Sequence, residues 1–72
     1  MNETSRNKGS KLNLRLRLIG EDGNAFNILG IAKRAMVRAK VSSELQKQYH
    51  AEATSGDYNK LLQVTMEYFY VF

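Results

Sequence analysis

The stretch KLNLRLRLI at residues 11–19 decides the fold, because its apolar residues alternate strictly with polar ones. The alternating apolar residues are Leu12, Leu14, Leu16 and Leu18. A period of two is typical of a β-strand with one face against a core. The residues between the leucines, including Arg15 and Arg17, are therefore expected on the opposite face of the strand.

The segment before this strand is polar. Residues 1–10 read MNETSRNKGS and offer almost nothing apolar to bury, so they are predicted to form a flexible polar tail. Residues 11–72 carry the apolar pattern and are predicted to form one small domain, because a chain of 72 residues makes one domain at most.

The segment after the strand predicts a turn and then a long helix. GEDGN at residues 20–24 contains glycines and turn-forming residues, and a helical period follows over residues 24–40. The residues that share one stripe of this helix are Ala25, Ile28, Leu29, Ala32, Ala35, Met36 and Ala39. Phe26 and Val37 fall outside the stripe, beside basic residues on the side expected to face water.

A second helix is predicted to begin at Ser42 or Ser43, since Ser43 and Gln46 have the spacing of a capping box. The stretch ATSGDY at residues 53–58 then has the residue types of a joint. Gly56 stands where a helix ends in the left-handed conformation, and Asp57 stands where a third helix takes its N-cap. We interpret this stretch as a connection between helices and not as an active-site loop.

The last residues, EYFYVF, replace the helical period with strand-forming aromatic residues and valine. They predict a terminal strand at residues 68–72, with one continuous helix to the end as the alternative. The fold class is therefore α+β, in the order β-α-α-α-β, with a two-stranded sheet packed against helices. Two strands make a marginal sheet with exposed edges, so we expect homo-oligomerisation to complete it.

Composition argues against several classes of function. The chain has no cysteine, and its single histidine, His50, has no partner at metal-ligand spacing, so neither a metal site nor a cofactor is predicted. Ser55 and Asp57 lie near His50 in sequence without a recognisable triad motif, and the chain is predicted not to be an enzyme. No apolar run is long enough to span a bilayer and no secretory segment is evident, which predicts a cytoplasmic protein.

Charge and exposed apolar residues supply the candidate binding surfaces. The net charge is +4, with the basic residues concentrated before Val41. The candidate residues for an anion or nucleic acid are Arg15, Arg17, Lys33, Arg34, Arg38 and Lys40, which form one patch if the strand and helix surfaces adjoin. The candidate residues for an oligomer or partner interface are Phe26, Val37, Tyr68, Phe69, Tyr70 and Phe72.

Two motifs, GEDGNAFNILGIAKRAM and EATSGDYNKLL, followed by an apolar end, resemble a group of small uncharacterised proteins of bacteria and their phages and plasmids. The resemblance covers about residues 12–70 and implies a phage or mobile-element accessory protein, without implying a mechanism. The function expected is non-enzymatic binding of a host or phage protein or of an anionic ligand. Nucleic-acid binding through a basic strand or helix face, and sequestration of a nucleotide by an oligomer, are the alternatives.

Overall fold

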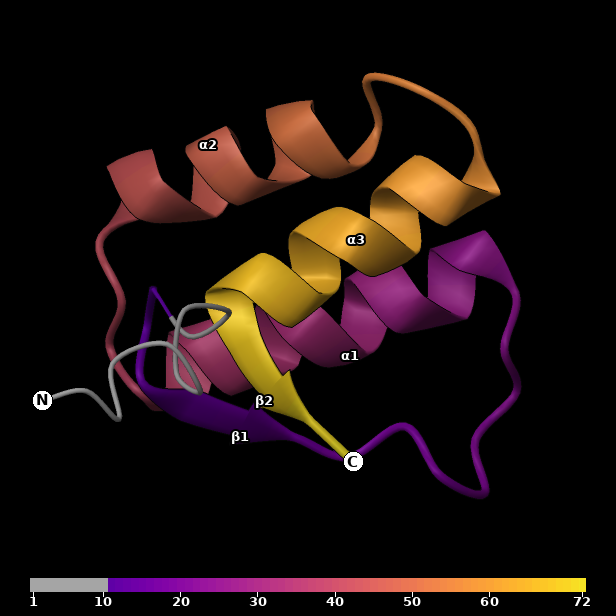
Figure 1. The fold of residues 1–72 in the computed structure, drawn as a ribbon. Coiled ribbons are helices and arrows are strands. Elements are labelled where there is room, and N and C mark those ends of the chain that lie inside the picture. The colour runs from indigo at the N-terminus through magenta and orange to yellow at the C-terminus, as the bar shows by residue number, and fades with distance from the viewer. Residues whose placement is uncertain (1–10) are drawn as a thin grey trace, which may run out of the picture.

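A computed structural model describes residues 11–72, so the predicted tail at residues 1–10 lies outside the described part. The elements are β1 (Leu14–Leu16), α1 (Ala25–Arg38), α2 (Ser43–Ala53), α3 (Tyr58–Tyr68) and β2 (Phe69–Val71). Figure 1 shows α2 and α3 above the two strands, with α3 leading directly into β2. The predicted α+β class, the β-α-α-α-β order and the packing of the sheet against helices are confirmed.

The two strands pair in parallel, with Leu14 opposite Phe69 and Leu16 opposite Val71. Parallel strands need a long crossover between them, and here all three helices form that crossover. β1 is shorter than the alternating leucines predict, because Asn13 has a φ of 55° and interrupts the extended backbone. Hydrogen bonds continue beyond the regular pair, from Leu12 N to Tyr68 O at 3.0 Å and from Phe72 N to Leu16 O at 3.0 Å.

The core lies between the sheet and the helices. Its buried apolar residues are Leu16, Ile28, Ala32, Met36, Tyr49, Ala53, Leu61, Val64, Tyr68 and Phe69. Three of them come from the predicted stripe of α1, while the other strand leucines are half-buried against the same cluster. The period of two and the helical period therefore identified the correct faces of β1 and α1.

α1 ends in a way that the sequence did not indicate. Lys40 has a φ of 62°, its N–H donates to Val37 O at 3.0 Å, and the N–H of Val41 donates to Met36 O at 2.9 Å. This is the paired hydrogen-bond pattern that closes many helices with a residue in the left-handed conformation. Lys40 therefore terminates α1 at a position where glycine is usual.

The N-cap of α2 is Ser42, one residue before the Ser43 of the predicted capping box, so the predicted pairing of Ser43 with Gln46 is wrong. Ser42 is the N-cap, and its Oγ accepts a hydrogen bond from Leu45 N at 3.2 Å. Gln46 Nε2 donates instead to Val41 O at 3.0 Å. The side chain of Gln46 thus fixes the entry of the chain into α2 by a different contact.

The joint between α2 and α3 confirms one expectation and corrects another. Asp57 caps α3, with Oδ1 accepting from Lys60 N at 3.0 Å. Gly56 does not adopt a positive φ, so the predicted left-handed helix stop is wrong. A Cβ at Gly56 would lie 3.0 Å from Lys60 Cβ, so a larger residue is crowded there and the small size of glycine suits the position.

Candidate functional site

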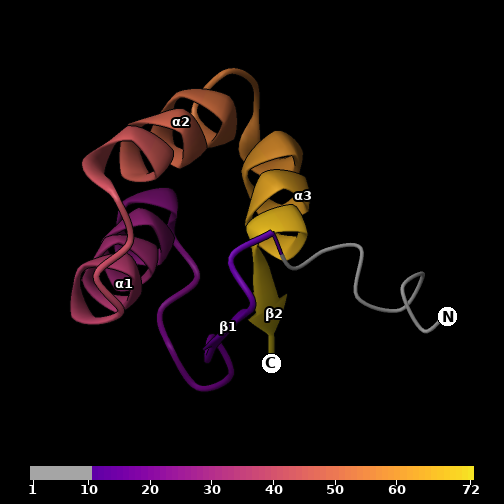
Figure 2. The same cartoon turned by 90° about the vertical axis from the view of Figure 1, so that its left-hand side faces the viewer.

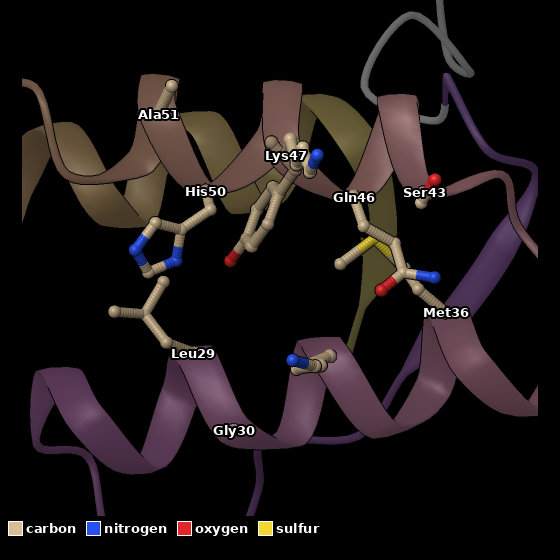
Figure 3. Close-up of a pocket in the computed structure, with 10 residues that line it drawn as sticks. Leu29, Gly30, Met36, Ser43, Gln46, Lys47, His50 and Ala51 are labelled. Carbon is tan, nitrogen blue, oxygen red and sulfur yellow. The ribbon is translucent and has the colours of Figure 1, made fainter.

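α1 and α2 enclose an open groove with a cavity volume of about 590 Å³. Leu29 and Met36 from α1 and Tyr49 from α2 supply its apolar lining. Figure 3 shows Leu29 and His50 approaching one another across one end, with Met36 and Gln46 at the other. The groove exists because α2 packs mainly on α3 and only lightly on α1.

The inner wall of the groove is fixed by an aromatic cluster in the core. Tyr49 is 1% exposed and meets Tyr68 and Phe69 edge to face, with ring centroids 5.3 and 5.6 Å apart. Such pairs stabilise beyond the area that they bury. The side chain that forms this wall is therefore preorganised by contacts from α3 and β2.

A buried hydrogen bond also holds Tyr49. Its Oη lies 2.7 Å from Thr65 Oγ1, and Thr65 Oγ1 donates to Leu61 O at 2.7 Å. Because a threonine hydroxyl has one hydrogen, Tyr49 must donate to Thr65. Burial raises the pKa of Tyr49, and the hydrogen bond to Thr65 partly offsets this increase.

The rim of the groove is basic. Lys33 projects from α1, and Lys47 and His50 from α2, and all three are exposed. No aspartate or glutamate is among the lining residues. The groove therefore combines an apolar floor with a rim whose charge favours anions.

A shallow second depression on α1 continues this surface, since Lys33 lines both. Its other lining residues are Arg34, Val37 and Arg38. Val37 is 55% exposed, and Phe26, on the same side of α1, is 88% exposed. From Phe26 to Val37 is eleven residues, or about 16 Å of helix.

The face of the sheet that points away from the helices forms a separate surface. The strand period places Arg15 of β1 and Tyr70 of β2 on this face, and the register pairs them. Arg17 and Phe72 directly follow the two strands and continue the same period. The guanidinium of Arg15 lies over the Phe72 ring, 4.8 Å from its centroid. Arginine and aromatic residues thus share the outer face of the sheet.

The structure sorts the predicted site residues into these surfaces. Arg15 and Arg17 lie on the sheet face, Lys33, Arg34 and Arg38 lie on the exposed side of α1, and Lys40 closes that helix. The basic patch predicted for adjoining strand and helix surfaces therefore draws its members from β1 and the residues after it, from α1 and from the end of α1. Figure 2 shows α1 to one side of the two strands.

The predicted interface residues divide in the same way. Tyr68 and Phe69 are 0% and 1% exposed within one chain, so their assignment to an exposed interface is corrected. They face inward because α3 and β2 meet at this point and direct both rings against Tyr49. Tyr70 is half-buried, and Phe72 is partly exposed.

Sequence reasoning missed the contribution of α2. No binding role was predicted for Lys47 and His50, whereas Leu29 and Met36 were correctly expected on the core stripe of α1. The sequence did hold one indication of this surface. Ser43, Lys47 and Ala51 are four residues apart, so they lie on one side of α2, and that side carries a lysine and no acidic residue.

The hydroxyls near His50 serve the backbone. Thr54 Oγ1 donates to His50 O and Ser55 Oγ donates to Glu52 O, each at 2.7 Å. Both groups satisfy carbonyls at the end of α2, as expected of helix-terminating residues. These contacts agree with the interpretation of ATSGDY as a joint.

Residues 11–72 contain neither a membrane-spanning helix nor a metal-binding cluster. No helix there is long and apolar enough to cross a membrane. Within the same described range, no cluster of three or more histidine, cysteine, aspartate or glutamate side chains is placed to hold a metal ion.

Comparison with known proteins gave no match to a family model, to a curated protein or to a solved structure.

Proposed function

We propose that this protein is a non-enzymatic binding module whose α1–α2 groove takes an acidic amphipathic helix from a partner protein. The observation that carries the proposal is the apolar lining, half-buried Leu29 beside buried Met36 and Tyr49, beneath a rim of Lys33 and Lys47 with no carboxylate in the lining. An amphipathic helix presents apolar anchors at helical spacing, and acidic flanks complement a basic rim.

The length of the surface favours a helix over a small anion. The cavity alone is within the size range of small-molecule sites. However, exposed Phe26 and Val37 extend the apolar surface along α1 for about 16 Å, which matches about three turns of a partner helix. A small ligand leaves most of that extension uncovered.

The setting and assembly of the protein belong to the same proposal. We place it among phage or mobile-element accessory proteins on the resemblance of its two motifs, with a host or phage protein as the partner in the cytoplasm. Homo-oligomerisation is a further proposal, supported by the short two-stranded sheet. Light scattering on the full chain measures it independently of groove binding.

The test of groove binding uses a designed peptide and charge reversal. The probe is a fluorescent acidic peptide of about 14 residues, with leucines at helical spacing flanked by glutamates. Its fluorescence anisotropy reports binding to the wild type and to the double variant Lys33→Glu/Lys47→Glu. We expect the double variant to weaken binding by about tenfold or more, because like charges then face the peptide.

The matched controls separate site from net charge. Lys60→Glu makes the same type of change on α3, outside the groove, and is expected to alter the affinity by less than about twofold. A scrambled peptide of equal charge, lacking the apolar stripe, should bind weakly. A loss from Lys60→Glu as large as the loss from Lys33→Glu/Lys47→Glu would contradict a groove site. If anilinonaphthalene sulfonate raised the Tm of the protein and the peptide did not bind, the ligand of the groove would be a small apolar anion and not a helix.

A further inference from the structure

The outer face of the sheet combines two charged and two aromatic side chains, and the groove proposal uses none of them. Arg15 and Arg17 alternate with core residues along the first strand, and Tyr70 and Phe72 alternate with core residues along the last. No acidic residue occurs among residues 11–19 or 69–72. We propose that this face binds single-stranded nucleic acid, with the rings stacking on bases and the guanidinium groups contacting phosphates.

The spacing of the strand places each pair at a regular interval. Residues two apart on one face of a strand are separated by about 6.6 Å. Tyr70 and Phe72 therefore present two rings in sequence, and Arg15 and Arg17 present two charges beside them. Because the strands pair in parallel with Arg15 opposite Tyr70, charges and rings run in the same direction. This arrangement matches a single strand, whose bases and phosphates also form two parallel rows.

The face is held in place by the core beneath it. Phe69 is 1% exposed and Leu16 is 2% exposed, so each strand is anchored directly next to the residues of the outer face. The main chain of Phe72 is also fixed, because its O accepts hydrogen bonds from Leu18 N at 2.6 Å and Ile19 N at 3.0 Å. The backbone that carries the rings is therefore held in place before a ligand arrives, which lowers the entropic cost of binding.

The contact between Arg15 and Phe72 favours bases as the ligand. The guanidinium lies over the ring at 4.8 Å, in the arrangement of a cation–π contact. An aromatic ring accepts the flat face of an unpaired base, and a guanidinium beside it can contact the phosphate of the same strand. A duplex buries those faces between its own base pairs, and an acidic peptide offers charge without a flat ring. The chemistry of this face therefore selects unpaired bases.

The experiment titrates the full-length protein into a fluorescent oligothymidylate of about 15 nucleotides at several salt concentrations and measures anisotropy. Phe72→Leu keeps an apolar side chain and removes the stacking surface. We expect it to weaken binding by about fivefold or more without changing the salt dependence. Arg15→Gln removes one phosphate contact, and we expect the slope of log K against log salt to become shallower by about 0.7.

Matched variants locate the site. Arg34→Gln makes the same change on α1, and we expect less than a twofold loss and an unchanged salt slope. Circular dichroism melts of all variants confirm that each one is folded. Equal losses from Arg15→Gln and Arg34→Gln would overturn the sheet-face site. Absence of binding at low salt, or a duplex of the same length binding as tightly as the single strand, would overturn the proposal altogether.

Discussion

Loss of the hydroxyl should change the free energy of unfolding differently at two buried tyrosines that contact one another. Tyr49 donates a hydrogen bond to Thr65, with the two oxygens 2.7 Å apart. The hydroxyl of Tyr68 is also buried, but it makes no hydrogen bond within residues 11–72. Both rings belong to the same core cluster, so the substitutions Tyr49→Phe and Tyr68→Phe isolate the hydroxyl.

The magnitudes follow from this difference. Tyr49→Phe should lower the free energy of unfolding by about 1 kcal/mol, the usual net value of one intramolecular hydrogen bond. In a domain of this size that corresponds to a fall in Tm of about 4–8 °C. Tyr68→Phe removes a hydroxyl that is desolvated without compensation, so it should leave stability unchanged or raise it by up to about 1 kcal/mol. Urea unfolding followed by circular dichroism measures both values.

A third variant tests the direction of the hydrogen bond. Thr65→Val leaves the Tyr49 hydroxyl as a buried donor without an acceptor, which should cost about 1–3 kcal/mol. The double variant Tyr49→Phe/Thr65→Val replaces both partners by apolar groups and should be more stable than Thr65→Val alone. Strictly additive effects, or equal losses from Tyr49→Phe and Tyr68→Phe, would refute this account of the aromatic cluster.

Three further predictions concern pH and the backbone of α1. Burial raises the pKa of Tyr49 and of Tyr68 above 10.0, so the unfolded chain loses these protons at a lower pH than the folded chain does. The free energy of unfolding should therefore hold below about pH 10 and fall above it. In urea titrations at alkaline pH, Tyr68→Phe should reduce that fall. Gly30 lies inside α1, where an added Cβ would meet Arg34 Nη1 at an ordinary 3.5 Å, so Gly30→Ala should raise the free energy of unfolding by about 0.5–1 kcal/mol. A lower free energy of unfolding would show that folding needs the smaller residue at this position. Lys40 has a left-handed backbone with a φ of 62°, so Lys40→Gly should stabilise by about 1 kcal/mol in the same assay, and destabilisation would contradict the assigned helix end.

The fold was predictable from the sequence because its signals are local and periodic. Alternation over residues 11–19 identified β1, and the apolar stripe identified the buried face of α1. Asp57 was recognisable as an N-cap from its residue type and position. Each of these features depends on a few neighbouring residues, and local chemistry was sufficient.

The helix ends were less predictable because glycine has more than one structural use. The sequence places a glycine at position 56 and a lysine at position 40, and propensity alone assigns the left-handed conformation to the glycine. The structure assigns it to Lys40, while Gly56 suits a position that lies close to the Lys60 side chain. Such a distinction depends on the path of the chain and not on composition.

The candidate surfaces were only partly predictable because they depend on how elements pack. Lys33, Arg34 and Arg38 were identified, but the groove also needs Lys47 from α2, whose position across from α1 follows from the packing of α2 on α3. Phe69 was assigned to an interface because strand formers at a chain end give no indication of which face is buried. Its burial means that polar substitution there tests folding and not oligomerisation.

The most direct test of the central claim is a nuclear magnetic resonance titration of the isotope-labelled full chain with the acidic amphipathic peptide. We predict that the backbone amide signals that move will belong to groove residues of both helices, including Gly30 and Lys33 of α1 and Lys47 and Ala51 of α2. Saturable shifts confined to these positions would support helix binding in the groove. No shifts, or shifts restricted to β1 and β2, would contradict it.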